Sequence, residues 1–431
     1  MSLFTPDVLQ LVQGSRLRKD EAARRLRYYW DEQSQETLQL IARKWSRPED
    51  FRIFSINMVR KIVDKRASTY RLKPRRNFVG MDQATGDAIY RSLNADGLLK
   101  KASRYTKLLK TTVLQVGWNE ATGKPTLNVL TPNVLDVQHT GDPEMLTRLI
   151  VTHDAGKAED RWYSDWTATT FNRRNYRGAR IRTDGNQGGQ NPYGIIPFVP
   201  LFDRLPDDQF FLPGGDDLIE AQTALNVALV NLWRSVETQA HGQPWATGIS
   251  ANEVLQLGPN RVITLPNGGE FGFASPNAPI SDILAAIEFL MRQTAATHDC
   301  GADVFDLSTL AESGSAKHAE RIELKEARLD DLELWRLAEQ RLFEVVKVVV
   351  NTHAPGTIPP GASLSVDFAE LQDQLTEAEA LDNTRTKIEL GLWSPVDALL
   401  ALNPDGFADR NAAHAELSRR RDESAALALP L

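Results

Sequence analysis

The sequence has almost no cysteine and no long apolar run. Cys300 is the only cysteine in 431 residues, which excludes an intramolecular disulfide framework and a cysteine-rich zinc site. No stretch approaches the ~18–20 apolar residues that a membrane span requires. The first residues, MSLFTPDVLQ, lack the basic-then-apolar pattern of a secretion signal. We therefore expect a soluble chain in a reducing, intracellular environment, with no membrane partner.

Sequence motifs of catalysis are also missing. A phosphate-binding loop has the pattern GxxxxGK[ST] after a strand, and the nearest stretch, SGSAKH, lacks this glycine spacing. There is no GxSxG motif, and the seven histidines form no HxxxH or HxxEH pair. One group of neighbours could hold a metal or a thiolate: His298, Asp299, Cys300 and Asp303. A small structural cysteine at a helix end explains Cys300 more simply. The sequence predicts no enzyme, no metal site and no cofactor.

Acidic residues outnumber basic ones by 57 to 50, so the net charge is −7. A protein that grips nucleic acid through its phosphates is normally basic, overall or in one domain. Lysine and arginine are densest in the first hundred residues, in RLRKDEAARRLRYYW and RKIVDKRASTYRLKPRR. These stretches fit either the solvated faces of amphipathic helices or a basic surface that meets an acidic partner.

The hydrophobic periodicity predicts a mainly helical α+β fold. Through residues 1–110 apolar positions recur at helical spacing, with breaks at Pro48 and Pro74. From about Leu109, short β-branched or aromatic runs such as KTTVLQVGWN and TRLIVTHD alternate with turn residues, which is typical of strands. The segment IIPFVPLFD reads as extended, but its prolines argue against a central strand.

Two long helical stretches then flank a segment rich in proline and glycine. The first, residues 216–240, carries an apolar stripe made of Leu218, Ala221, Leu225, Ala228, Leu232 and Val236. The second, residues 278–299, has an apolar face made of Ile280, Ile283, Leu284, Ile287 and Leu290. Between them only short strand-like pieces occur, such as NRVITLP and GEFGF. The pattern predicts a helical hairpin with a compact β-containing insert at its tip.

A short polar run rich in Ser, Gly and Ala follows and leads into one of the longest helical patterns of the chain. Beyond that helix, GASLSVDFAE reads as a strand, and the remainder reads as helices with breaks at Gly391, Pro395 and Pro404.

In this order, the parts resemble the portal proteins (head–tail connectors) of tailed double-stranded DNA bacteriophages. Local strings are similar as well: NMVRKIVDKRASTY to the family's N-terminal helix, NVLTPNVLDVQHTGD to a strand pair with a Pro-centred turn, and ESGSAKHAERIEL to the entry into its long helix. NPYGIIPFVPLFD with GGDDLIEAQTALN resembles the approach to the first stem helix. Each string alone consists of common residue types, so the resemblance depends on their joint order. The segment corresponding to the clip and the segment corresponding to the crown are short compared with larger relatives.

The resemblance implies the parts of a portal subunit. These are a wing (residues 1–215), a first stem helix (216–240), a clip (241–277), a second stem helix (278–299), a tunnel loop (300–315), a long wing helix with its connection (316–362), and a strand with a helical crown (363–431). It also implies a ring, a dodecamer in this family, around a channel that passes double-stranded DNA without sequence preference during packaging and ejection. Its implied partners are terminase, the major capsid and scaffold proteins and a head-completion adaptor. The implied location is the portal vertex of the virion, and the host cytoplasm during assembly.

The resemblance also assigns candidate residues. The DNA-facing tunnel loop would comprise Val304, Phe305, Asp306, Leu307, Ser308, Thr309, Leu310, Ala311, Glu312, Ser313, Gly314 and Ser315. Small residues and few bases suit a loop along which DNA slides, because each neutralised phosphate adds affinity. The same residues also fit an ordinary exposed loop before a helix. Lys317 and Arg321 would either line the channel or pair with Glu320 and Glu323. The clip's partner surface would include Trp245, Asn252, Arg261, Asn267 and Gly268.

Two other classes of protein stay open at this point. Scattered carboxylates that converge on metal ions would make a nucleic-acid-processing enzyme such as a nuclease. Another structural protein of a phage head or tail is a further alternative.

Overall fold

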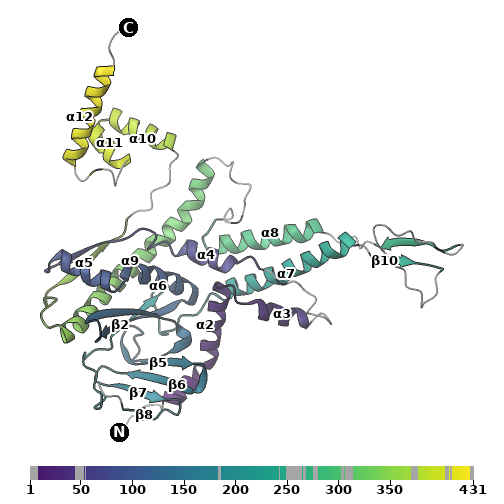
Figure 1. Ribbon diagram of the computed structural model, residues 1–431, viewed down its shortest axis with the longest axis horizontal. Helices are drawn as coiled ribbons and strands as arrows, with labels where there is room; N and C mark the ends of the chain where they lie inside the picture. The colour runs from purple at the N-terminus through teal and green to yellow at the C-terminus, as the bar shows by residue number, and fades with distance from the viewer. Residues whose placement is uncertain are drawn as a thin grey trace. The chain divides into compact units, whose positions relative to one another are not determined.

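The structure is a computed structural model of the chain. It describes residues 8–43, 53, 55–182, 186–241, 243–248, 265, 268–274, 280–301, 305, 314–369, 377–402, 407 and 410–427. The chain divides into two compact units, Met1–Ala369 and Glu370–Leu431, and each is treated by itself here. The first unit mixes helices and sheets, so the fold is α+β, as the periodicity predicts (Figure 1).

The described part of the first hundred residues is helical apart from one strand. Its helices are α1 (Val8–Gly14), α2 (Arg16–Tyr29), α3 (Ser34–Ala42), α4 (Met58–Arg66), α5 (Gln83–Ser92) and α6 (Ala95–Leu109). In α4 the buried positions recur at helical spacing, at Met58, Val59, Ile62 and Val63. Basic residues occupy its remaining face and its last turn. In the last turn their positive charge interacts favourably with the negative end of the helix dipole. This basic stretch is therefore one face of an amphipathic helix.

The exception is β1 (Arg75–Val79), a strand that the sequence does not predict. It pairs antiparallel with β12 (Ser363–Asp367), and Phe78 lies opposite Leu364. Arg76 and Phe78 point inward and their neighbours are exposed, but because one inward residue is an arginine, no apolar alternation marks the segment as a strand. Its partner comes from a distant part of the chain, and only the tertiary fold brings the two together.

Two antiparallel sheets occupy the middle of the chain. One has the order β3 (Lys124–Leu130), β2 (Thr111–Asn119) and β9 (Phe198–Phe202). The other follows chain order, after the short helix η2 (Pro132–Val134): β4 (Leu135–His139), β5 (Leu146–Ala155), β6 (Lys157–Trp166), β7 (Phe171–Asn175) and β8 (Arg180–Ile181). As its prolines predict, β9 is an edge strand, with Pro200 opposite Val113 of β2.

The long helix α9 (Gly314–His353) joins the three-stranded sheet and the β1–β12 pair into one core. It packs against β2, β3, β9 and β12. Its buried apolar residues include Trp335, Leu342, Phe343, Val346 and Val349. Glu339 is fully buried on the same helix, where it accepts hydrogen bonds from Arg76 (2.6 and 2.9 Å) and from the Tyr70 hydroxyl (2.9 Å). A paired buried carboxylate thus ties α9 to β1.

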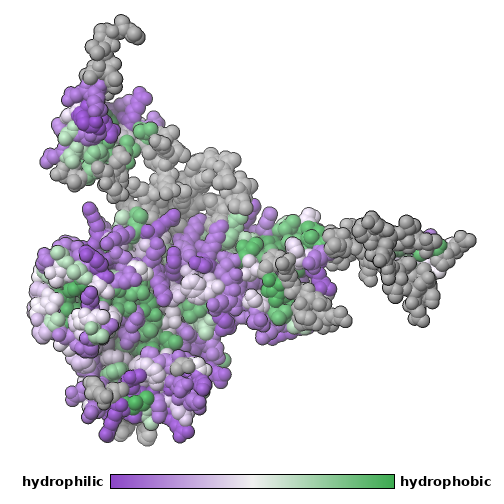
Figure 2. Space-filling model, viewed as in Figure 1, coloured by the Kyte–Doolittle hydropathy of each residue, from purple (hydrophilic) through white to green (hydrophobic). Residues whose placement is uncertain are grey.

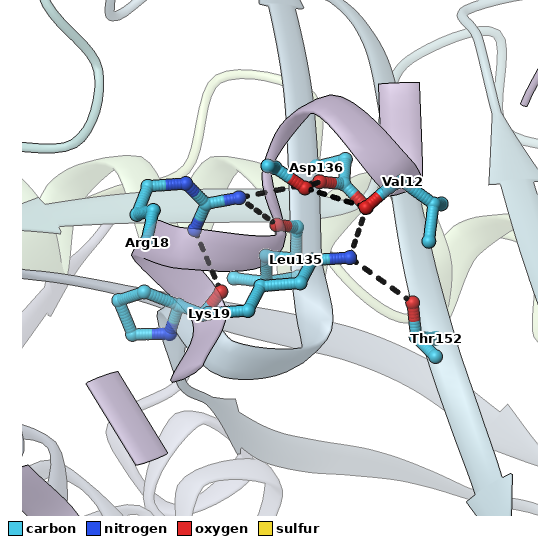
Figure 3. Close-up of polar contacts among 8 residues, drawn as sticks. Val12, Arg18, Lys19, Leu135, Asp136 and Thr152 are labelled. Carbon is cyan, nitrogen blue, oxygen red and sulfur yellow. Dashed lines mark hydrogen bonds and ion pairs between the residues drawn. The ribbon is translucent and has the colours of Figure 1, made fainter. Parts of the chain in front are cut away.

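A second buried carboxylate, Asp136 at the start of β4, holds the N-terminal end of α2 against the five-stranded sheet (Figure 3). Its oxygens accept hydrogen bonds from Ser15, from Lys19 and, at 3.2 Å, from Arg18. Lys19 also reaches Thr152 on β5 at 3.4 Å. Arg18 donates further bonds of 2.7 Å to two backbone carbonyls, those of Pro132 and Leu135. Arg18 and Lys19 of α2 are therefore used inside the subunit.

The predicted helical hairpin is present. Helices α7 (Asp216–His241) and α8 (Ile280–Thr297) lie side by side (Figure 1), and between them come the paired strands β10 (Gln243–Ala246) and β11 (Phe271–Ala274). Most of the predicted apolar stripe faces inward: Leu218 and Leu225 are buried, and Ala221, Ala228 and Leu232 are partly buried. Two positions depart from the prediction, because Val236 and Leu284 are exposed.

In the second unit the described residues form three helices. They are α10 (Glu377–Glu389), α11 (Pro395–Leu402) and α12 (Arg410–Leu427). Asp397 accepts hydrogen bonds from the backbone N–H and hydroxyl of Ser394, at 2.9 and 2.6 Å, and pairs with Arg410. These bonds cap the start of α11 and connect it with α12.

Candidate functional site

The helical hairpin and its base are the candidate functional site, because the predicted stem, tip and tunnel-loop residues all belong to them or follow directly. We call the hairpin base the set of residues where α7 and α8 meet α2 and α4. Here Gln222 of α7 is completely buried. Its Oε1 accepts hydrogen bonds from the backbone N–H groups of Met58 (2.8 Å) and Val59 (3.2 Å). Its Nε2 donates to the Ile56 carbonyl (2.9 Å) and to Asn226 Oδ1 (2.8 Å). One side chain of the hairpin thus caps α4.

Helix α2 holds the beginning of α7. Arg25 donates to the Gly214 carbonyl at 2.7 Å and to Asp216 at 2.5 Å, just where α7 starts. One turn further, the Tyr28 hydroxyl and the Thr223 hydroxyl are 2.7 Å apart. The hairpin base is therefore rigidly attached to two separate N-terminal helices through buried or partly buried polar contacts.

The end of α8 is held by α4 and by α7. Lys65 donates to the Cys300 carbonyl at 2.7 Å, and Arg66 lies 3.2 Å from Asp299. Asp299 has a left-handed backbone (φ +54°), which turns the chain out of α8. Asp217 Oδ2, in the first turn of α7, lies 3.2 Å from His298 Nε2. The end of α8 is thus tied both to the start of the hairpin and to α4.

Burial controls the ionisation of two side chains at the end of α8, His298 and Cys300. Burial lowers the pKa of His298, and Asp217 opposes this shift only in part. At neutral pH the imidazole is therefore uncharged, and its contact with Asp217 is not an ion pair. Burial also raises the pKa of Cys300 to about 11, so its thiol stays protonated. Cys300 is the small structural residue that the sequence suggests, packed inside the hairpin base.

The outside of the hairpin carries large exposed apolar side chains. On α7 these are Trp233 and Val236, and on α8 they are Leu284 and Phe289, the last of which is 69% exposed. Figure 2 shows apolar residues over the hairpin on the face in view. Helices α7 and α8 bury their other faces against each other and against the hairpin base.

At the hairpin tip, the described residues form a small β-ribbon. Trp245 of β10 lies opposite Gly272 of β11. A Cβ added to Gly272 would come within 2.9 Å of the Trp245 ring, so the absence of a side chain there leaves room for the indole. Gly268 has a left-handed backbone (φ +87°) in the turn before β11. Of the predicted clip residues, Trp245 and Gly268 are described, whereas Asn252, Arg261 and Asn267 lie outside the described residues.

Most of the predicted tunnel loop lies outside the described residues. Phe305 is described: its ring packs on the hairpin base, and Lys61 Nζ lies 4.6 Å from the ring centroid. Gly314 and Ser315 belong to the first turn of α9, so this helix begins two residues earlier than predicted. Lys317 and Arg321 are on the same helix, but their side chains are not described. The others lie outside the described residues: Val304, Asp306, Leu307, Ser308, Thr309, Leu310, Ala311, Glu312 and Ser313.

Sequence reasoning missed the polar residues that anchor the hairpin. Gln222 and Asn226 stand four residues apart, beside the apolar stripe of Leu218 and Leu225. Polar residues that interrupt an apolar face at helical spacing are the available signal, because a buried amide must find partners. Their partners on α4 could not be named from sequence.

The described residues show no group of three or more His, Cys, Asp or Glu side chains placed to hold a metal ion. Among the helices that the structure describes, none has both the length and the apolarity to cross a membrane.

No protein-family model matches the chain, and no curated protein matches it significantly. Among solved structures, it is similar to a chain of the virion of the native gene transfer agent (GTA) particle, with 14% identity and a TM-score of 0.42. It is also similar to chains in the neck of the empty GTA particle computed with C6 symmetry (15%, 0.42) and in the neck of the native GTA particle computed with C12 symmetry (14%, 0.41). Each match covers 80% of this chain and 88% of the other. At such identities and TM-scores the likeness assigns no function.

Proposed function

We propose that the chain is a structural subunit of a tailed phage or phage-like particle, and that copies of it form a portal-type ring around a DNA channel. The observation that carries this proposal is the hairpin of α7 and α8, which is fixed at its base and exposes Trp233, Val236, Leu284 and Phe289. A neighbouring copy of the same hairpin would cover these side chains. A head-to-tail contact, in which one face of the hairpin meets a different face on the neighbouring copy, closes a ring when it is repeated around an axis.

A conduit also suits the charge of the chain. With a net charge of −7, the subunit has little general affinity for DNA phosphates, and weak contact lets DNA slide. We propose that residues 304–315, between α8 and α9, line the narrowest part of the channel. The hairpin base would hold this segment in place through the Lys65, Arg66 and Cys300 contacts at the end of α8. Lys317 and Arg321 would follow at its edge.

The proposed partners follow from this assembly. The tip, residues 241–277, would dock terminase during packaging and a head-completion adaptor afterwards. The N-terminal helices would face the major capsid and scaffold proteins. Packaging would draw its energy from terminase, since the sequence carries no phosphate-binding loop of its own. The subunit would act without catalysis or cofactor, first in the host cytoplasm and then in the virion.

The test is the mass and shape of the purified full chain. A subunit has a mass of 48.1 kDa, so twelve copies give about 580 kDa. Mass photometry should report a single assembly of several hundred kilodaltons, and negative-stain class averages should show an axial hole. A compact monomer or dimer without a hole would refute the proposal, and DNA cleavage that depends on a divalent metal would favour the nuclease alternative.

A pair of substitutions on α8 locates the contact. Phe289→Glu places a charge on the most exposed apolar residue of the hairpin, and it should shift the mass distribution toward the monomer. The neighbouring change Glu288→Gln, at an exposed polar position, is the matched control and should leave the assembly intact.

A further inference from the structure

A polar cavity of about 680 Å³ lies far from the hairpin in sequence, between β1 and α5. Its walls come from the segment before β1, from β1 itself, and from α5 with the start of α6: Lys73, Pro74, Arg75, Arg76, Asn77, Gln83, Asp87, Tyr90, Arg91 and Asp96. A cavity of this volume is in the range of small-ligand sites.

Gln83 fixes the two walls of the cavity relative to each other. Its Oε1 accepts a hydrogen bond from the backbone N–H of Phe78 at 3.1 Å, and its Nε2 donates to the Arg76 carbonyl at 2.8 Å. One α5 side chain therefore bonds to both ends of a short stretch of β1. These hydrogen bonds fix α5 relative to β1, so the backbone of the two elements defines the cavity.

The basic side chains that line the cavity differ in whether a carboxylate of the protein already binds them. Arg76 is already used, because Glu339 and Asp96 both accept hydrogen bonds from its guanidinium group. Lys73 lies 3.2 Å from Asp96. The exposed side chains of Arg75 and Arg91, by contrast, have no ion pair or hydrogen bond with any residue that the structure describes. Two guanidinium groups thus face the cavity without an acceptor.

Tyr90 supplies an independent sign of a ligand. The residue lines the cavity and is only 5% exposed, yet its hydroxyl has no hydrogen-bond partner among the described residues. A buried hydroxyl without a partner costs free energy that a bound acceptor would recover. Burial raises the pKa of Tyr90 well above its ordinary value, so the hydroxyl keeps its proton and can donate it.

We propose that this cavity, lined by Arg75, Arg91 and Tyr90, binds a phosphate group. Four cations line it against the two carboxylates Asp87 and Asp96, and Asp96 is neutralised by its own partners. The guanidinium groups of Arg75 and Arg91 outnumber the remaining carboxylate of Asp87, and their planar forks fit the oxygens of a phosphate group. The phosphate belongs either to a small free anion or to a nucleic-acid backbone. This site is independent of the proposed ring and of its channel.

Isothermal titration at constant ionic strength tests the site with inorganic phosphate and pyrophosphate, and with glutarate as a dicarboxylate control. We expect saturable binding of the phosphate compounds and weaker binding of glutarate. Arg75→Gln and Arg91→Gln should each weaken phosphate binding by about two- to five-fold. Tyr90→Phe removes no existing hydrogen bond, so it should weaken binding by a similar factor while Tm stays unchanged.

Of two further variants, one should strengthen phosphate binding and the other should leave it unchanged. Asp87→Asn removes a carboxylate from the cavity and should strengthen phosphate binding. Lys157→Gln removes an equally exposed cation from a different sheet and should change nothing. Absence of phosphate and pyrophosphate binding at millimolar concentration overturns the proposal. So does equal binding by the wild type and an Arg75→Gln, Arg91→Gln double variant, or equal binding of glutarate.

Competition separates the two sources of the phosphate. A short double-stranded oligonucleotide that displaces pyrophosphate from the wild type identifies a nucleic-acid backbone as a ligand of the site. Retention of pyrophosphate in the presence of excess oligonucleotide identifies a small free anion. Both outcomes support a phosphate site, and both are measurable whether or not the chain forms a ring.

Discussion

The side-chain amide of Gln222 on α7 caps the backbone of Met58 on α4, with 2.8 Å between Gln222 Oε1 and the Met58 nitrogen. The same amide donates to the Ile56 carbonyl, so it bonds to both an N–H group and a carbonyl of the segment that leads into α4. Because Gln222 is fully buried, water cannot replace these bonds. The hairpin and the N-terminal helices are therefore rigidly connected at this point.

Replacement of Gln222 by leucine should destabilise the fold. Leucine fills a similar volume but removes the side-chain acceptor of the Val59 N–H group and one of the two acceptors of the Met58 N–H group, at a cost of about 1–3 kcal/mol. Denaturant unfolding followed by circular dichroism measures this loss. The matched control Glu220→Gln lies on the exposed side of the same helix and should stay within about 0.5 kcal/mol of the wild type. A Gln222→Leu protein as stable as that control would contradict the capping role.

Stability should fall when the solution is acidified below the ordinary pKa of histidine. Burial depresses the pKa of His298 in the folded state below its unfolded value of 6.5, so the folded chain holds fewer protons in this range. The contribution of His298 is complete above about pH 6.5 and is lost as the pH falls through the folded-state pKa. Thermal melts from about pH 7.5 to about pH 5 should show this decline.

The variant His298→Gln separates this contribution from that of other groups. Burial also lowers the pKa of His153 in β5, so part of the acid sensitivity should remain in the variant. We expect a smaller drop in Tm on acidification for His298→Gln than for the wild type. Identical drops in the two proteins would show that His298 does not titrate against folding.

The thiol of Cys300 should react slowly in the native protein. A pKa of about 11 instead of 9.0 lowers the thiolate fraction near neutral pH by about 100-fold, and burial blocks access further. Alkylation by iodoacetamide, followed by mass spectrometry, should therefore be at least about 100-fold slower before unfolding than after it. Comparable rates in the two states would mean that the end of α8 opens readily. Since Cys300 is the only cysteine, the readout is unambiguous.

Glu339→Leu should be among the most damaging single changes in the chain. It leaves Arg76, whose side chain is 6% exposed, as a buried charge with one of its two carboxylate partners removed. Breaking a buried pair from one side costs about 3–5 kcal/mol. Glu344→Gln on the same helix removes an exposed pair with Lys347 and should cost less than about 1 kcal/mol. Similar unfolding free energies for the two variants would contradict the structural role of Glu339.

Gly86→Ala should destabilise the packing of α5 on β1. An added Cβ would lie 2.3 Å from the Phe78 ring, which is itself buried between Tyr90 and Phe343. Relief of this clash requires a shift of helix against strand, at a cost of about 1–3 kcal/mol. Gly14→Ala in α1 meets no atom within 4 Å and should be neutral or stabilising by up to about 1 kcal/mol, as helix propensity predicts. Denaturant unfolding of the two variants provides the comparison.

Local patterns in the sequence predict many of the elements. The helices α7 and α8 and the edge position of β9 follow from apolar spacing and from proline, both of which act over a few residues. The same spacing placed Val236 and Leu284 in the apolar stripes of their helices, and both are exposed. Periodicity reports which residues share a face, but it does not report how far along the helix a partner extends.

Contacts between distant segments could not be predicted in this way. Strand β1 has no strand pattern of its own and exists because β12 pairs with it. Gln222 reads as an ordinary polar residue until α4 is placed beside it.

The sequence by itself determined the composition and the local patterns of this protein. These are one cysteine, an excess of acidic residues, no nucleotide-binding motif, and a helical hairpin before a long helix. These properties depend on composition and on spacing along the chain, which are local. The tertiary structure alone decided which buried polar groups meet, which apolar side chains stay uncovered on the hairpin, and where unpaired cations gather. Such properties depend on distances in space between residues far apart in sequence, since burial and hydrogen bonding are satisfied only by the folded chain.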